Sequence, residues 1–182
     1  MFDQVSIIGC GLIGSSIFKG LKKVGSIKKI ISYDKDKTVT EIIKKDRLSD
    51  EIFDSVGEAV KNSDLVIIAT PISSFESVLN SIKDNLKTGS ILTDTCSVKT
   101  GVGKILQKIN LKNSICIPGH PVAGIENSGP KAGIPDLFKN RWTILTPKKN
   151  IDEKAIKEVS NFWESMGSKV KIMSDVDHDK IL

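Results

Sequence analysis

The sequence predicts an α/β protein with a doubly wound, mostly parallel β-sheet. Apolar runs of strand length alternate with amphipathic segments of helix length, an order typical of parallel sheets covered by helices. A glycine-rich turn follows the first apolar run, and an aspartate ends the second. At 182 residues and 39% hydrophobic composition, the chain is long enough for one well-buried α/β domain.

The individual elements follow from the spacing of apolar residues. Short apolar runs predict strands at residues 5–8, 30–33, 65–69, 91–93, 115–117, 142–145 and 170–173. Apolar residues three or four positions apart predict crossover helices at residues 12–24, 38–45, 74–86, 100–109 and 152–166. We expect Ser74 and Asp152 to cap helix N-termini and Gly167 to end a helix. Residues 118–141 break the alternation, and a loop of that length in a compact domain is usually functional.

The glycine-rich turn has the spacing of a Rossmann-type dinucleotide-binding unit. Gly9 allows a tight bend, Gly11 lets the backbone approach a pyrophosphate, and Gly14 brings the helix against the strand. Leu12 and Ile13 begin that helix, whose N-terminus would face the phosphates. We therefore assign this whole set to cofactor binding and weigh a purely structural glycine turn as the weaker alternative.

Asp34 ends the second predicted strand, about 20 positions after Gly14, as in dinucleotide-binding units. A carboxylate there can accept hydrogen bonds from the adenosine ribose hydroxyls, which favours NAD as the cofactor. Lys35 and Lys37 lie beside Asp34 and could tolerate a 2′-phosphate, so NADP stays possible.

Thr70 and Pro71 follow the third predicted strand. They therefore lie at the carboxyl edge of the sheet, where open α/β sheets bind their ligands. We expect both residues to belong to the cofactor site, and we give a simple helix-capping turn equal weight for Thr70.

Ser97 and His120 lie in the loops after the next two predicted strands, so both belong to the same ligand-facing edge. A histidine there could polarise a substrate hydroxyl and take its proton while hydride leaves the same carbon. Ser97 could hydrogen-bond to that imidazole or to the hydroxyl itself. We predict that His120 and Ser97 are catalytic, with a purely structural histidine as the alternative.

Composition argues against several other classes of protein. The three cysteines, Cys10, Cys96 and Cys116, form no CxxC pair, so we expect no disulfide framework and no metal site. We expect Cys10 and Cys96 to be small buried thiols. The net charge of +5 comes from dispersed lysines, without the basic and aromatic clusters typical of nucleic-acid binding. Asp3 and the glycines that follow argue against a signal peptide, and no apolar run approaches a membrane span. We expect a cytoplasmic protein with neither nucleic-acid nor membrane partners.

Short motifs carry a family resemblance over essentially the whole chain: GCGLIGSS at 9–16, ATP at 69–71, DTCSVK at 94–99, GHPVAGIENSG at 119–129 and LFKNRWTILTP at 137–147. Through them the chain resembles the prephenate and arogenate dehydrogenases of tyrosine biosynthesis. These enzymes use NAD(P) to oxidise a hydroxyl-bearing ring carbon while the ring carboxylate leaves as CO2, which yields 4-hydroxyphenylpyruvate or tyrosine. The resemblance implies that His120 binds the substrate hydroxyl and that Ser97 is its partner.

The same resemblance implies a domain organisation. Family members continue into a helical domain that forms the dimer and supplies a second histidine and an arginine for the substrate carboxylates. We expect residues 1–173 to form the NAD(P)-binding domain and residues 174–182 to begin the helical domain. A full-length version would then be a homodimer, and this chain alone could lack activity. His178, in the last segment, is expected to be exposed or packed against a missing neighbour rather than catalytic.

Some assignments stay open at the level of sequence. Lys99, Glu126, Ser128 and Arg141 could contact a dicarboxylate substrate, although a role in holding the loop is as well supported. β-Hydroxyacid dehydrogenases and imine or pyrroline reductases share a similar glycine turn, but lack the block at 119–129. A NAD-binding regulatory module without chemistry is an alternative of a different class.

Overall fold

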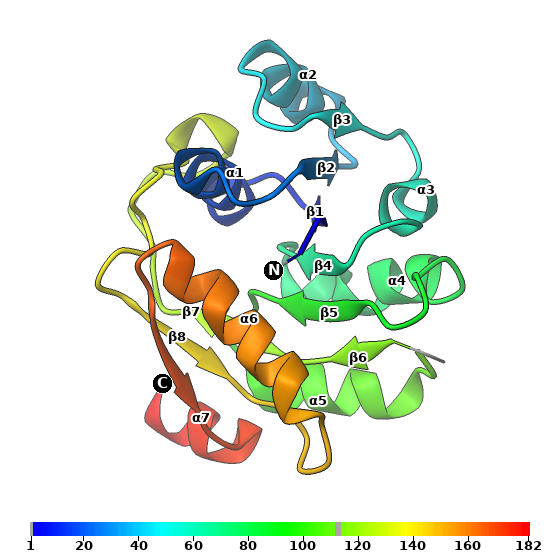
Figure 1. The fold of residues 1–182 in the computed structure, drawn as a ribbon, viewed down its shortest axis with the longest axis vertical. Helices are drawn as coiled ribbons and strands as arrows, with labels where there is room; N and C mark the ends of the chain where they lie inside the picture. The colour runs from blue at the N-terminus through cyan, green and yellow to red at the C-terminus, as the bar shows by residue number, and fades with distance from the viewer. Residues whose placement is uncertain (1, 112–113) are drawn as a thin grey trace.

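The computed structural model describes residues 2–111 and 114–182, and strands and helices alternate along the chain. The strands are β1 (Gln4–Ile8), β2 (Lys29–Tyr33), β3 (Glu51–Ile52), β4 (Leu65–Ile68), β5 (Ile91–Asp94), β6 (Ile115–Cys116), β7 (Gly119–Pro121), β8 (Trp142–Leu145) and β9 (Lys169–Ile172). The helices are α1 (Leu12–Val24), α2 (Lys37–Lys45), α3 (Val56–Val60), α4 (Ile72–Ile82), α5 (Lys99–Lys108), α6 (Glu153–Ser165) and α7 (Asp175–Ile181), with a 3₁₀ turn η1 (Pro130–Ala132). Figure 1 shows these elements in space.

The first six strands form one parallel sheet in the order β3-β2-β1-β4-β5-β6. This is the strand order of the Rossmann fold, and it confirms the predicted doubly wound sheet. From β1 the chain builds the sheet in one direction through β2 and β3, and it then returns to form β4 on the other side of β1. Open sheets of this kind form a crevice outside the carboxyl ends of the strands at such a reversal.

β4 illustrates why this sheet has helices on both faces. Leu65 and Ile67 belong to one hydrophobic core, whereas Val66 and Ile68 belong to the other. Successive side chains of a strand point to opposite faces, so an unbroken apolar run is buried on both. Residues of α1 and α6 complete the first core, and residues of α3, α4 and α5 complete the second.

β7, β8 and β9 form a second sheet, whereas the sequence predicts a single one. β7 runs antiparallel to β8, and β8 runs parallel to β9. β7 lies within residues 118–141, which were expected to form a loop. The rest of that segment is attached to α1. Lys19 Nζ donates to Gly133 O at 2.8 Å, and Ile134 N donates to Ser16 Oγ at 3.0 Å.

The predicted helix ends are correct at α6 and wrong at α4. Asp152 caps α6 by accepting a hydrogen bond from Lys154 N at 2.9 Å. Gly167 follows the helix with φ of +83°, a conformation that favours glycine. Ser74, in contrast, lies inside the first turn of α4, because that helix begins directly after Pro71. Pro71 is the N-cap of α4 and has a non-helical backbone, with ψ of 149°.

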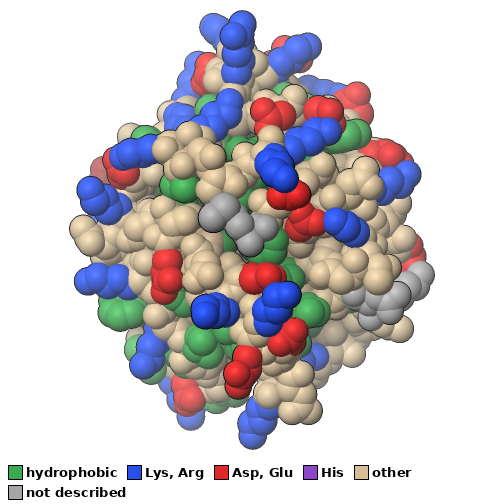
Figure 2. Space-filling model, viewed as in Figure 1, with side chains coloured by type: hydrophobic (Ala, Val, Ile, Leu, Met, Phe, Trp, Pro, Cys, Tyr) green, Lys and Arg blue, Asp and Glu red, His purple; other side chains and the backbone are tan. Residues whose placement is uncertain are grey.

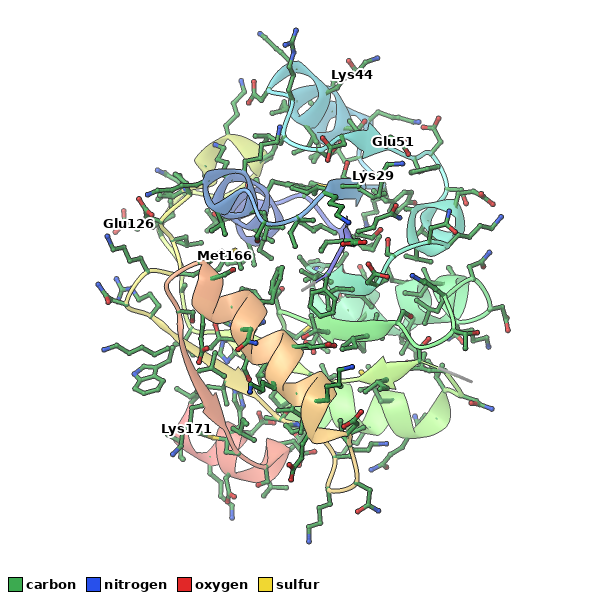
Figure 3. The ribbon with its side chains drawn as sticks, viewed as in Figure 1. Lys29, Lys44, Glu51, Glu126, Met166 and Lys171 are labelled. Carbon is green, nitrogen blue, oxygen red and sulfur yellow. The ribbon has the colours of Figure 1, made fainter. Side chains whose placement is uncertain are left out.

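Charged side chains of both signs are interspersed over the face shown in Figure 2. At the β2–β3 edge, Lys29 Nζ pairs with Glu51 Oε1 at 2.8 Å, and Figure 3 labels the two residues on neighbouring strands. Both side chains are exposed, so such a pair contributes only about 0–1 kcal/mol to stability. Among the described residues, no helix is long and apolar enough to cross a membrane.

Phe138 provides a test of how firmly the segment between β7 and β8 is held. Its side chain is fully buried, and the centroid of its ring lies 5.2 Å from the ring centroid of Trp163 in α6. We predict that Phe138→Ala lowers the free energy of unfolding by about 3–5 kcal/mol, measured by urea denaturation. Lys139→Ala, at the exposed neighbouring position, is the control and should change it by no more than about 0.5 kcal/mol. Equal unfolding midpoints for both variants would contradict this packing.

Candidate active site

A cavity of about 470 Å³ opens at the carboxyl ends of β1, β2 and β4. Its lining comes from the glycine-rich turn, the segment after β2, helices α2, α3 and α4, and the turn before η1. The lining residues are Ile8, Gly9, Gly11, Tyr33, Asp34, Lys35, Asp36, Val39, Val56, Ala69, Thr70, Pro71, Ser74, Ser77, Val78, Ser81, Gly129 and Pro130. The cavity therefore lies at the strand reversal, and its walls combine apolar and hydroxyl side chains.

The glycine-rich turn has the geometry that was predicted from its spacing. Gly9 has φ of +94°, and a Cβ on Gly14 would lie only 2.0 Å from Gly9 O, so a side chain at Gly14 would prevent α1 from packing against the turn. A Cβ on Gly11 would meet no heavy atom within 4 Å in the described structure. Leu12 and Ile13 form the first turn of α1. The start of this helix is thus open to an approaching anion.

Asp34 connects the end of β2 to the glycine-rich turn. Its Oδ2 accepts a hydrogen bond from Cys10 N at 2.7 Å, and its Oδ1 accepts one from Asp36 N at 2.9 Å. A carboxylate has about four lone-pair sites, so these two bonds leave acceptor capacity for a ligand hydroxyl. Lys35 also lines the cavity, whereas Lys37 Nζ pairs with Asp54 Oδ1.

Thr70 and Pro71 lie where β4 passes into α4. Pro71 is the N-cap of that helix, and both residues line the cavity. Thr70 Oγ1 is buried and has no hydrogen-bond partner among residues 2–111 and 114–182. An unpaired buried hydroxyl costs free energy, so its presence beside a cavity fits a site that a polar ligand completes.

A buried ion pair joins the two sheets next to His120. Lys99, whose side chain is fully buried, donates from Nζ to Asp94 Oδ2 at 2.5 Å and to Gly119 O at 2.6 Å. Gly119 N donates in turn to Asp94 Oδ1 at 3.1 Å. Because Asp94 ends β5 and Gly119 begins β7, these bonds fix β7 against the main sheet. His120 is thereby placed beside the carboxyl end of β5.

His178 lies in a different environment from the one that its charged segment predicts. It was expected to be exposed or to lack a neighbour, yet its side chain is fully buried. Its Nε2 lies 2.8 Å from His120 Nδ1, and its Nδ1 lies 2.7 Å from Asp179 Oδ1. The reason is the position of α7, which packs against α5 and brings His178 to β7. The structure thus brings together the two histidines of the chain.

The surroundings of His120 favour a neutral imidazole. Burial, together with the neighbouring His178 and the Lys99 ammonium, lowers the pKa of His120 from its usual value of 6.5 to about 4. The carboxylates of Asp94 and Asp179 act in the opposite direction but do not compensate. His120 Nε2 has no hydrogen-bond partner within the described part of the chain, so it can accept a proton from a ligand.

Ser97 lies in the same region, but within the described part of the chain it forms no hydrogen bond to His120. It is exposed in the loop between β5 and α5, whereas the preceding Cys96 is buried, with Sγ 3.8 Å from Thr70 O. This contact places the loop against the cavity edge. Burial raises the pKa of Cys96 to about 12, which confirms the expected inert thiol. Glu126, labelled in Figure 3, is exposed in the segment after β7.

The predicted site residues therefore form two adjoining groups. Gly9, Gly11, Asp34, Thr70 and Pro71 line the cavity, and the other predicted cofactor residues follow in α1. The predicted catalytic pair lies beside the neighbouring end of β5, outside the cavity lining among the described residues.

Comparison with known proteins identifies one family. The family model for the prephenate dehydrogenase nucleotide-binding domain matches residues 17–172. The cyclohexadienyl dehydrogenase of Zymomonas mobilis is 37% identical over 182 residues, which are 100% of this chain and 62% of that protein.

Solved structures of prephenate and arogenate dehydrogenases are similar to this chain in fold. The prephenate dehydrogenase of Aquifex aeolicus in complex with hydroxyphenyl propionate and NAD+ superposes with a TM-score of 0.86 at 29% identity, covering 100% of this chain and 63% of that one. The arogenate dehydrogenase of Synechocystis has a TM-score of 0.89 at 25% identity, covering 98% of this chain and 62% of that one. The chain spans less than two thirds of the length of these relatives.

The neutral state of His120 can be measured by an NMR pH titration of its ring resonances. We predict a midpoint at about 4, well below 6.5. The unfolded chain would bind this proton near pH 6.5, so His120 makes the folded state less stable as the pH falls from 6.5 to about 4. A midpoint at or above 6.5 would contradict the described surroundings of the imidazole.

We predict that the Lys99–Asp94 pair is required for the stability of the folded protein. Lys99→Met leaves the buried carboxylate of Asp94 without its cation, which costs about 3–5 kcal/mol in such cases. Urea denaturation should show this loss. Lys104→Met, at an exposed position of the same helix, is the matched control and should unfold like the parent. A parent-like midpoint for Lys99→Met would show that the pair does not hold the two sheets together.

Proposed function

The chain belongs to the family of prephenate dehydrogenase nucleotide-binding domains, and from this premise we propose that it carries the NAD-binding and proton-accepting part of a prephenate or arogenate dehydrogenase. The reaction is the oxidative decarboxylation of prephenate to 4-hydroxyphenylpyruvate, or of arogenate to tyrosine. The observation that carries this proposal is His120, a neutral imidazole on β7 that lies beside the carboxyl edge of the main sheet, where the cavity also opens.

The proposed cofactor is NAD, with its pyrophosphate at the N-terminus of α1. Gly11 leaves open space there, and the backbone N–H groups at the start of the helix favour an anion. Leu12 and Ile13 belong to that first turn, and the unpaired hydroxyl of Thr70 is a candidate partner for a polar group of the cofactor. Bound NAD would accept the hydride that leaves the substrate carbon.

Asp34 is the proposed determinant of the preference for NAD. Its carboxylate lines the cavity at the end of β2, where a 2′-phosphate would add negative charge beside it. Lys37 is paired with Asp54 and therefore offers little compensation. Lys35 lines the same cavity and is the residue that could accommodate the phosphate of NADP, the weaker ligand in this proposal.

His120 supplies the base in the proposed mechanism. Its neutral Nε2 accepts the proton of the substrate hydroxyl as hydride leaves the same carbon. The ring carboxylate departs as CO2, the ring becomes aromatic, and the imidazolium returns the proton to the same oxygen. Aromatisation supplies the driving force, so the protein mainly orients the substrate and stabilises charge at that oxygen.

Ser97 is proposed to hydrogen-bond to the substrate hydroxyl. The alternative, a bond to His120 Nδ1, is less favoured because His178 already occupies that nitrogen. Ser97 is exposed on the same edge of the sheet, so its hydroxyl is accessible to a substrate.

The relatives are longer than this chain, and we propose that their additional part supplies the remaining substrate contacts. Recognition of the substrate carboxylates, the choice between prephenate and arogenate, and a homodimer interface are assigned to that part. The division between a cofactor-binding domain at 1–173 and a helical domain from 174 stays a prediction.

The proposal is tested by replacing His120 in a fusion of this chain with the part of the Zymomonas mobilis relative that the alignment does not cover. NADH formation is followed with prephenate and with arogenate. We predict that His120→Asn lowers kcat by about 10²–10⁴-fold, the usual contribution of a general base. NAD affinity, measured by calorimetry, should stay unchanged because His120 does not line the dinucleotide cavity in the described structure.

Lys171→Gln, at an exposed position on β9, is the control and should retain full turnover. A fusion that binds NAD but oxidises neither substrate would favour a regulatory module. Undiminished turnover in His120→Asn would refute the assigned role of the histidine.

A further inference from the structure

We propose that His178 and Asp179 are positioning residues that hold His120 in the tautomer whose Nε2 is free to accept a proton. The inference rests on the proposed function and deepens it, because these residues act through His120 and not on the substrate. The contacts run from β7 to α7 and from there to the start of α5, and Figure 1 shows α7 beside α5.

The geometry is that of a continuous hydrogen-bonded chain. His120 Nδ1 lies 2.8 Å from His178 Nε2, with ring centroids 5.0 Å apart and an interplanar angle of 62°. On its other side, His178 Nδ1 lies 2.7 Å from Asp179 Oδ1. The His178 side chain is fully buried, so water cannot replace either partner. Each ring nitrogen of His178 is therefore committed to one neighbour.

Asp179 is fixed at the N-terminus of α5. Its Oδ1 accepts a hydrogen bond from Lys99 N at 2.8 Å, and its Oδ2 accepts one from Thr100 N at 2.9 Å and another from the Thr100 hydroxyl. Val98, the N-cap residue, provides no side-chain cap in the described structure. Asp179 thus caps α5 from a different helix, where a negative charge is favoured.

The direction of each hydrogen bond follows from this anchor. A carboxylate only accepts, so His178 Nδ1 must carry the proton that is donated to Asp179. In a neutral His178, Nε2 is then an acceptor, and His120 Nδ1 must donate to it. His120 Nε2 is left with its lone pair, which is the form that a general base requires.

The charges that surround His178 are stabilised by other partners. Although burial raises the pKa of Asp179, the hydrogen bonds from Thr100 and Lys99 hold it well below its usual range. The Asp179 charge is therefore stabilised without a protonated histidine. The ammonium of Lys99 is buried against Gly119, the residue before His120, and a second buried cation in this region would cost free energy.

The tautomer can be read without substrate, cofactor or turnover. The chain contains only two histidines, so long-range 1H–15N spectra of histidine-labelled protein resolve each ring. We expect both rings to carry the proton on Nδ1. A proton on Nε2 of His120 in the parent protein would overturn the proposal.

Variants of His178 distinguish a role in orienting His120 from a role in packing alone. In His178→Gln the amide oxygen can still accept from His120 Nδ1, so the tautomer should be retained. In His178→Leu that acceptor is gone, and a population with the proton on Nε2 of His120 should appear. Lys180→Gln, an exposed position on the same helix, is the control and should leave the spectrum of the parent. An unchanged tautomer in His178→Leu would overturn the proposal.

A second variant and the turnover of the fusion enzyme test the same role of His178 and Asp179. If His178→Leu does not fold, Asp179→Ala removes the acceptor of His178 Nδ1, and it should also shift His120 toward the tautomer with the proton on Nε2. In the fusion enzyme, His178→Leu should lower kcat about 10²-fold, the scale of a misplaced catalytic group, with NAD affinity unchanged. His178→Gln should retain most of the kcat of the parent fusion. Equal losses of kcat in His178→Leu and His178→Gln would refute a positioning role for His178.

An inactive parent fusion would count against the proposed function alone, because the tautomer of His120 is measured without turnover.

Discussion

The buried pair between Lys99 and Asp94 is the interaction on which the rest of the site depends. Two charges without solvent are costly, and they are tolerated because each is also hydrogen-bonded to the backbone. Asp94 ends a strand of the main sheet, and Gly119, bonded to both charges, begins the second sheet. One polar contact therefore decides where β7 lies, and with it the position of His120.

Lys99 also links that contact to the other histidine. Its side chain holds β7, while its backbone N–H donates to Asp179, the residue that fixes His178. Lys99, at the start of α5, is thus bonded both to β7, which carries His120, and to Asp179 on α7, which contacts His178. Nearby, the same sheet edge forms a cavity whose glycine-rich turn leaves a helix N-terminus open to a phosphate. The proposed dinucleotide site and the imidazole of His120 therefore lie beside the same edge of the main sheet, the combination that hydride transfer from an alcohol requires.

Local sequence patterns were sufficient for the parts that one stretch of chain encodes. The glycine-rich turn, the main sheet and the position of Asp34 follow from spacing within βαβ units. β3, α3 and β7 are two to five residues long and have too little periodicity to be predicted. The burial of His178 was missed because it depends on His120, 58 positions away, and its charged segment suggested exposure. The signal available was two histidines, one of them next to Asp179.

If the proposed function is correct, the cavity at the glycine-rich turn and His120 belong to one site. The most direct measurement compares NAD with ADP-ribose, which lacks the nicotinamide, by NMR of the labelled chain. Both ligands should shift the amide resonances of Gly11 and Asp34, whereas only NAD should shift the ring resonances of His120. Binding of NAD that leaves the His120 ring unchanged, or no binding of either ligand at Gly11, would contradict it.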